Sequence, residues 1–265
     1  MMTDNVLKVA VIAYDIAWGD KEENLLSVAA LLERVEHGTD IVVLPELFST
    51  GYVQEESVIQ ECAEPLSGKT MDAVRRWAKH YGFAICGSYM ASTAGAFYNR
   101  AFFIEPSGDE NFYDKRHLFS MSRESRLFNA GTRQSPIVRY RGWNISMVIC
   151  YDIRFPAWCR NRDNRYDLLL VPANWPSVRE HAWKHLLIAR AIENQAYVVG
   201  ANRSGRDDCG GYLIEQSIVV DYKGKIVNER RDGEIMYASL SHDLLSEFRR
   251  KFPVWNDADD FTLAD

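Results

Sequence analysis

The chain has 265 residues, a formal net charge of −6 and a pI near 5.6. Hydrophobic residues make up 47% of it, which is enough apolar material for the core of one α/β domain. The acidic balance argues against a nucleic acid or an anionic membrane as partner, because both favour a basic protein face. We therefore expect a single domain over residues 1–265, with 249–265 as a C-terminal tail.

In chain order, we predict a strand over 6–14, a helix over 21–35, a strand over 40–46, a helix over 70–82, strands over 83–90, 98–106 and 143–150, a short helix around 156–163, a strand over 167–174, a helix over 180–195, a strand over 196–203, a hairpin over 212–229 that turns at Lys223–Gly224, a strand over 234–241 and a last short helix. The helix over 21–35 has one apolar face behind an acidic first turn, and Gly82 is a suitable C-cap for the helix before it. Strands that alternate with helices, combined with hairpins in both halves, favour a mixed sheet in a layered α/β domain.

The N-terminal segment lacks the basic start and long apolar run of a signal peptide, since Lys8 interrupts the apolar stretch from Val6 to Tyr14. The five cysteines are odd in number, scattered and without CxxC spacing, so neither a disulfide framework nor a zinc site is indicated. We expect a soluble cytoplasmic protein.

Three strand-like segments carry an unusual ionisable residue at or near their ends. "VVLPELF" contains Glu46, "NFYDKRHLF" contains Lys115, and "MVICYD" contains Cys150. In layered α/β folds, ligands bind beyond the carboxyl ends of strands, so these residues are candidates for a site. Each also has a plain structural interpretation: a helix cap for Glu46, a solvated surface lysine for Lys115 and an inert buried thiol for Cys150.

Taken together, the three side chains suit one reaction. A thiolate at Cys150 is a strong nucleophile toward a carbonyl or nitrile carbon. Glu46 can take the thiol proton if burial raises its pKa toward neutrality. Lys115 can stabilise the oxyanion of the tetrahedral intermediate, with help from the backbone N–H of Tyr151. Spacing alone does not show that the fold joins them.

The segments "VVLPELFSTGY", "YDKRHLF" and "VICYDIRFP" resemble the three signature segments of the nitrilase superfamily, the carbon–nitrogen hydrolases, and they occur in the right order. The resemblance covers nearly the whole chain. It implies Glu46 as general base, Lys115 as oxyanion partner, Cys150 as nucleophile, and a four-layer αββα sandwich that forms a homodimer. It also implies a second glutamate, Glu124, that would orient the lysine or the substrate amide.

Within this family, "CYDIRFPAW", "ANWP" and "ARAIENQAYVVGANR" look most like the bacterial omega-amidase branch, which hydrolyses the terminal amide of 2-oxoglutaramate or 2-oxosuccinamate. An anionic substrate needs a cation, and Arg154 and Arg203 are the candidates, although Arg154 could instead form an ion pair with Asp152. Asn174 could bond the substrate's carboxylate or keto oxygen. Trp175 and Phe119 could form walls of the pocket.

Other activities of the family share the same three side chains. A nitrilase attacks a nitrile carbon, and an N-carbamoyl amino acid amidohydrolase cleaves a carbamoyl group, so both stay open, as does an idle binding module on the same fold. No cofactor is implied, because the chain has no GxGxxG, P-loop or HExxH motif. We expect no metal at the site, since the histidines do not form a ligand cluster.

Overall fold

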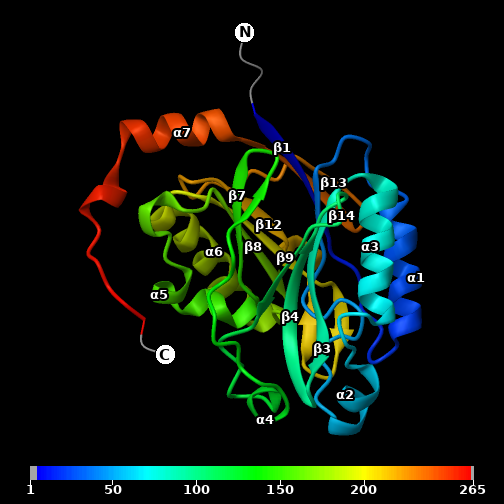
Figure 1. The fold of residues 1–265 in the computed structure, drawn as a ribbon. Coiled ribbons are helices and arrows are strands. Elements are labelled where there is room, and N and C mark those ends of the chain that lie inside the picture. Colours follow the sequence, from blue (N-terminus) through cyan, green and yellow to red (C-terminus); the bar gives the residue numbers. More distant parts are fainter. Residues whose placement is uncertain (1–4, 264–265) are drawn as a thin grey trace.

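The computed structural model describes residues 5–263, which form two β-sheets packed face to face between outer helices (Figure 1). Residues 1–4 and 264–265, the ends of the predicted domain and tail, lie outside the described residues. A helix with the length and apolar character needed to cross a membrane is not found within 5–263.

The larger sheet has seven strands and mixes parallel with antiparallel pairing. In spatial order it consists of β13 (Arg230–Asp232), β14 (Ile235–Ser241), β1 (Val6–Ile12), β2 (Ile41–Val43), β3 (Ala84–Thr93), β4 (Ala96–Ile104) and β5 (Glu110–Asp114). Only β1, β2 and β3 run parallel to one another; each of the other pairs is antiparallel.

The second sheet has five strands and a parallel centre. Its spatial order is β12 (Ile218–Val220), β9 (Tyr197–Asn202), β8 (Leu168–Ala173), β7 (Trp143–Met147) and β6 (Val138–Tyr140). Strands β7, β8 and β9 are parallel, and antiparallel strands form both edges. A separate two-stranded hairpin joins β10 (Gly205–Asp207) to β11 (Gly210–Tyr212).

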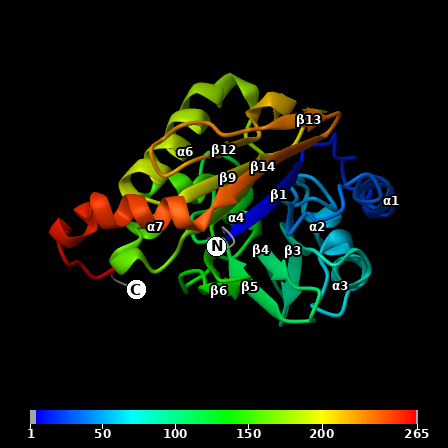
Figure 2. The same ribbon diagram turned by 90° about the horizontal axis from the view of Figure 1, so that it is seen from above.

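Helices cover the outer faces of both sheets (Figure 2). The α-helices are α1 (Lys21–Leu32), α2 (Glu56–Cys62), α3 (Lys69–Tyr81), α4 (Glu124–Leu127), α5 (Pro156–Cys159), α6 (Glu180–Asn194) and α7 (His242–Lys251). Helix α3 ends as predicted at Gly82, which adopts a left-handed conformation with φ of 77°.

Strand β1 shows why two layers form on either side of the larger sheet. Its odd-numbered residues, such as Val9 and Val11, belong to the core between the two sheets, whereas Ala10 and Ile12 pack in the cluster that includes α1 and α3. Both faces of the strand are therefore buried, and the strand sequence is almost continuously apolar. On the other side, Trp183 of α6 is fully buried in the core of the second sheet.

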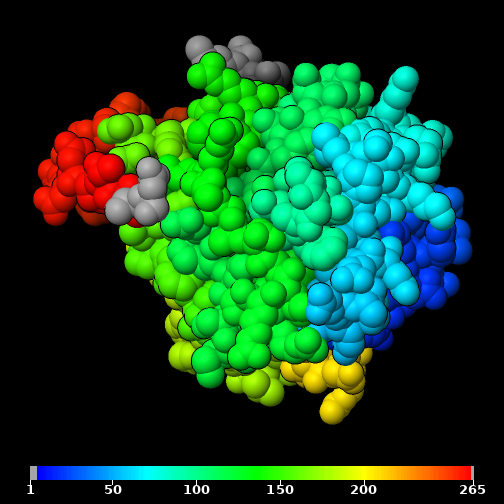
Figure 3. Space-filling view, turned by 60° about the horizontal axis from the view of Figure 1, so that its bottom comes forward, coloured from blue at the N-terminus to red at the C-terminus, as the bar shows by residue number. Residues whose placement is uncertain are grey.

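The layered α/β prediction is confirmed, but three local predictions differ from the structure. The turn at Gly224 is present, yet the predicted hairpin over 212–229 reduces to a single bridge between Val220 and Ile226, because β12 pairs with β9 instead. The helix predicted around 156–163 ends at Cys159. The first residues of the predicted tail, 249–251, belong to α7, and the segment that follows, red in Figure 3, contacts the body where Arg162 donates to the carbonyl of Phe261 at 2.9 Å.

Candidate active site

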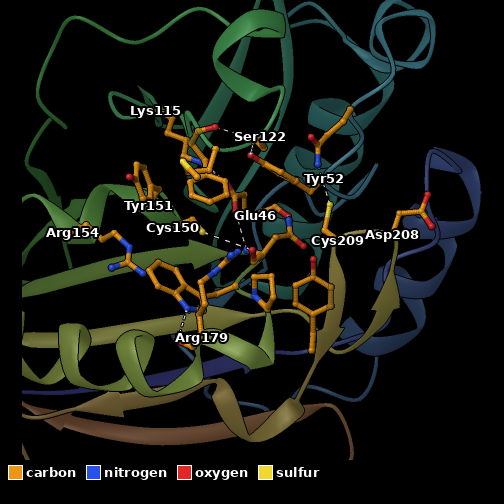
Figure 4. A pocket seen from close by; sticks show the side chains of 17 residues that line it. Glu46, Tyr52, Lys115, Ser122, Cys150, Tyr151, Arg154, Arg179, Asp208 and Cys209 are labelled. Carbon is orange, nitrogen blue, oxygen red and sulfur yellow. Dashed lines mark hydrogen bonds and ion pairs between the residues drawn. The ribbon is translucent and has the colours of Figure 1, made fainter.

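Three strand ends bring the predicted catalytic side chains into one cavity (Figure 4). Glu46 lies three residues beyond β2, Lys115 comes directly after β5, and Cys150 lies three residues beyond β7, at the start of the 3-10 helix η1 (Cys150–Arg154). All three line a cavity of about 290 Å³. This volume is at the small end of the range for ligand pockets, so it suits a short linear molecule.

Lys115 is held between two carboxylates in the interior. Its Nζ donates to Glu46 Oε1 at 2.8 Å and to both oxygens of Glu124, at 2.8 and 3.1 Å. Each of the three side chains is at most 1% exposed. The hydroxyl of Tyr52 and the backbone N–H of Phe119 also donate to Glu124 Oε2. Glu124 therefore uses both oxygens within the protein, which fits the predicted role of orienting the lysine.

The charges and the burial of this cluster shift the pKa values of both Lys115 and Glu46. Burial opposes the charged form of Lys115, but the carboxylates of Glu124 and Glu46 outweigh it and raise the pKa of the lysine well above its usual value. Burial also raises the pKa of Glu46, and the negative charge of Glu124 adds to this effect against the attraction of Lys115. Lys115 therefore stays a fixed cation, while Glu46 is a carboxylate that accepts a proton more readily than an exposed one.

Cys150 sits in a strained left-handed backbone conformation, with φ of 45°. Its side chain is 7% exposed, and its Sγ lies 3.9 Å from the carbonyl oxygen of Asn174. Burial and the neighbouring charge of Glu46 raise the pKa of the thiol, although Lys115 acts in the opposite direction. The resting thiol is therefore protonated, and it needs Glu46 as a base at the moment of attack.

Buried Asp152 fixes the turn that carries the cysteine. One of its oxygens accepts the N–H of Ile149 at 3.0 Å and the hydroxyl of Tyr113 at 2.7 Å, while the other accepts the N–H of His117 at 2.9 Å. Asp152 is thus committed to the turn, and no ion pair between it and Arg154 is present in the described part of the chain. The structural alternative for Arg154, a pair with Asp152, does not hold.

Asn174 clamps Glu46 with two donors. Its backbone N–H donates to Glu46 Oε2 at 2.8 Å, and its side-chain Nδ2 donates to the Glu46 carbonyl at 2.6 Å. Asn174 lines the cavity, and one of the two N–H groups of its side-chain amide is bonded to Glu46. The second N–H of this amide is not used by that bond, so the prediction that the side chain bonds a substrate carboxylate or keto oxygen stays open.

Arg154 lies at the cavity beside aromatic rings. Its guanidinium carbon is 4.8 Å from the ring centroid of Trp175 and 5.9 Å from that of Tyr151. Trp175 and Phe119 also line the cavity, as the sequence predicted. Arg154 forms no ion pair with any residue in 5–263, so its N–H groups remain available to an anionic ligand.

Arg203 is the predicted substrate ligand that the structure places outside the cavity lining. Its fully buried guanidinium donates to Asp207 Oδ2 and to Asp15 Oδ1, each at 2.7 Å, and lies 4.7 Å from the ring centroid of Tyr212. Because carboxylates occupy its donors, the expected contact with substrate does not fit. Asp207 and Tyr212 belong to the β10–β11 hairpin, and Tyr212 lines the cavity, so Arg203 supports a wall of the site.

The loop between Lys115 and Gly131 carries several cavity residues and closes on itself. The N–H of Gly131 donates to the carbonyl of Lys115 at 2.8 Å, and the N–H of Lys115 donates to the carbonyl of Asn99 at 2.9 Å. A methyl group on Gly131 would lie 2.1 Å from the carbonyl oxygen of Asp114. The loop therefore needs a residue without a side chain where it rejoins β5.

Sequence reasoning missed part of the lining. The additional residues are Tyr52, Gln54, Met121, Ser122, Pro176, Arg179, Asp208, Cys209 and Tyr212. The glycines of "DDCGGY" were the available signal for the hairpin that carries the last three, and Arg179 lies only five residues beyond Asn174 in the "ANWPSVR" segment. Within residues 5–263, no group of three or more His, Cys, Asp or Glu could hold a metal ion.

The chain is similar to several known proteins over nearly its whole length. The family model described as carbon-nitrogen hydrolase matches residues 8–250. The chain is 40% identical to an omega-amidase of Escherichia coli, YafV, over 97% of this chain and 98% of that protein. It is 31% identical to the 2-oxoglutaramate amidase of Bacillus subtilis, over 94% of this chain and 96% of that protein.

Among solved structures, the chain is similar to a CN-hydrolase superfamily protein of Xanthomonas campestris that carries an arsenic adduct in its active site. The two share 37% identity and superpose with a TM-score of 0.91, over 99% of this chain and 100% of that one.

Proposed function

The chain belongs to the carbon–nitrogen hydrolase family, and from this premise we propose that it acts on the terminal amide of 2-oxoglutaramate or 2-oxosuccinamate. Membership confirms the family assignment made from the three motifs, and the chain is a carbon–nitrogen hydrolase of the omega-amidase type. The Lys115 ammonium held between Glu46 and Glu124, in the cavity that contains Cys150, supports the hydrolytic chemistry. The observation that carries the choice of substrate is Arg154, which lines the same cavity and forms no ion pair within residues 5–263.

The acylation half of the reaction follows from this arrangement. Glu46 takes the thiol proton as Cys150 Sγ attacks the amide carbon, and the electron pair of the carbonyl moves to oxygen. Lys115 and the backbone N–H of Tyr151 stabilise that oxyanion. When the intermediate collapses, Glu46 returns the proton to nitrogen, the C–N bond breaks, and ammonia leaves a thioester on the cysteine.

Deacylation uses the same groups in the reverse roles. Glu46 accepts a proton from water as the water oxygen attacks the thioester carbon. The C–S bond then breaks, the carboxylic acid leaves, and Cys150 regains its proton from Glu46. Glu124 touches neither the sulfur nor the substrate in this scheme, and it serves to hold Lys115 in place through two hydrogen bonds.

The substrate's far end is recognised by Arg154, with Trp175 and Phe119 as apolar walls. An arginine without a carboxylate partner can bind the carboxylate of the substrate through two parallel hydrogen bonds. Asn174 can donate its second side-chain N–H to the carboxylate or keto oxygen of the substrate. Arg203 is left out of this contact set because carboxylates occupy its donors.

Two further expectations remain proposals. A homodimer follows from the family resemblance, and light scattering of the purified chain would test it. Action in the cytoplasm is supported by the five cysteines, all of which are free thiols in the structure, as in a reducing compartment.

The test of the function is a comparison of 2-oxoglutaramate, 2-oxosuccinamate, glutamine, butyramide, a simple nitrile and an N-carbamoyl amino acid at equal concentration, read by ammonia release. The 2-oxo acid amides should be preferred, and glutamine should be poor because its α-ammonium would face the arginine. If butyramide is turned over as fast as 2-oxoglutaramate, or if the nitrile or the carbamoyl compound is faster, the omega-amidase assignment fails.

A further inference from the structure

Arg179 is a second cationic side chain at the cavity that the triad and the family motifs leave unassigned. It ends the short 3-10 helix η3 (Ser177–Arg179) that leads into α6, and it lines the same cavity as Cys150. Its guanidinium carbon lies 5.2 Å from the ring centroid of Phe119. Like Arg154, it forms no ion pair with any described residue.

One tryptophan connects the two arginines. The Trp175 ring lies 4.8 Å from the guanidinium carbon of Arg154, and its indole Nε1 donates to the carbonyl oxygen of Arg179 at 2.9 Å. The backbone N–H of Trp175 is bonded to buried Asn202 at 2.8 Å. Both arginines therefore contact the side chain of Trp175, whose backbone is held in place by Asn202.

The aromatic contacts suit binding at the edges of the guanidinium groups. A guanidinium stacked on a ring keeps its in-plane N–H groups free, and these are the groups that pair with a carboxylate. Phe119 is also fixed, because its backbone N–H donates to Glu124 at 2.7 Å. The ring that contacts Arg179 therefore belongs to a residue whose backbone is bonded to Glu124, the same carboxylate that holds Lys115.

The remaining charges of the cavity leave this end positive. Lys115 is compensated by two carboxylates, whereas Arg154 and Arg179 are not compensated. Asp208, the other charged residue of the lining, is on the β10–β11 hairpin and lies at the opposite side of the view from Arg154 (Figure 4).

We infer that Arg179 is a specificity-determining residue that forms, with Arg154, a two-arginine clamp on the distal carboxylate of the amide substrate. This inference rests on the proposed function. It assigns to Arg179 the recognition of the substrate's distal carboxylate, at the end opposite the scissile bond. Two arginines can donate hydrogen bonds to both carboxylate oxygens, and their positive charge excludes an ammonium from the same place.

The experiment compares glutaramate with pentanamide, two amides of equal chain length of which only the first has a carboxylate. The measured quantity is the ratio of their kcat/KM values in the wild type, Arg179→Met, Arg179→Lys and the control Arg206→Met. Arg206 is an exposed arginine on the hairpin that does not line this cavity. Circular dichroism checks that each variant is folded.

Arg179→Met should lower the ratio about 10- to 100-fold, mainly through KM for glutaramate, because one charged arm is lost. Arg179→Lys should recover part of the ratio, and Arg206→Met should leave it unchanged. A ratio that stays within about twofold of wild type in Arg179→Met overturns the clamp, and so does an equal loss for both amides. If the wild type prefers pentanamide, the proposed function fails first, which separates the two outcomes.

Discussion

Glu46 Oε1 lies 2.8 Å from Lys115 Nζ, although 69 residues separate the two in the chain and both are fully buried. The lysine is also bonded to Glu124, so a single cation is shared by two carboxylates. A buried ion pair is costly to break, because removing one partner leaves the other charge without compensation in the interior. This arrangement therefore makes the site sensitive to any change of charge within it.

Cys150→Ala should abolish ammonia release from every amide while the protein stays folded, because the substitution removes one sulfur atom. Cys150→Ser should be nearly as inactive, since a hydroxyl is much harder to deprotonate than a thiol. Activity is measured by ammonia release and folding by circular dichroism. Normal turnover by purified Cys150→Ala would assign the nucleophile elsewhere.

Glu46→Gln and Lys115→Met should each lower kcat at least about 10²- to 10³-fold, the range expected for a lost base or a lost oxyanion partner. Because the two groups act as a unit, the double variant should be little worse than the more severe single variant. The comparison requires folded protein, so thermal unfolding of each variant is measured in parallel. Effects that simply multiply would contradict the shared role.

Arg203→Met should raise KM more than it lowers kcat, because the arginine holds the hairpin that carries Tyr212 but does not line the cavity itself. It leaves the carboxylates of Asp207 and Asp15 without their cation, so the melting temperature should fall as well. The double variant Arg203→Met/Asp207→Asn removes one of these charges and should recover part of the stability. If kcat falls and KM is unchanged, the arginine acts on the chemistry rather than on the wall.

His242 gives the fold a pH-dependent contact away from the site. Its Nε2 lies 3.5 Å from Asp167 Oδ2, and this hydrogen bond raises the pKa of the histidine above its usual 6.5, against partial burial and the charge of Arg249. The stabilisation is therefore complete below the unfolded-state pKa and is lost as the pH rises through the folded-state value. Asp167, whose pKa is lowered, stays ionised over this range.

The free energy of unfolding, measured by urea titration from pH 6 to pH 8, should therefore fall more in the wild type than in His242→Gln. Activity against amides should keep its pH profile in this variant, because His242 is not part of the cavity lining. Parallel stability curves for the two proteins would show that the histidine makes no such contribution.

The sequence was informative where side-chain chemistry and strand ends coincide. Glu46, Lys115 and Cys150 could be predicted because each closes or follows an apolar run within a family motif, and the fold places all three in one cavity. The same rule was wrong for Arg203, which also ends an apolar strand. A strand end does not determine which way a long side chain turns, and here two acidic partners, Asp15 and Asp207, draw the guanidinium away.

The β10–β11 hairpin was harder to predict because it has almost no apolar pattern. Its strands have three residues each, and only glycines and Tyr212 distinguish them from a loop. Arg179 was missed for a different reason: it lies on a short 3-10 helix, where neither strand nor helix periodicity indicates which way its side chain points.

The closed loop between Lys115 and Gly131 has a consequence for protein engineering. Because backbone hydrogen bonds fasten it at its base, the segment can be treated as an exchangeable module that carries Phe119, Met121 and Ser122 to the cavity. Replacing residues 118–122 with those of a relative, while Glu124 and Gly131 are kept, should change the range of amides accepted without unfolding the sandwich. If the grafted protein keeps the same substrate preference, residues 118–122 do not contribute to selectivity, which then depends on Arg154 and Arg179.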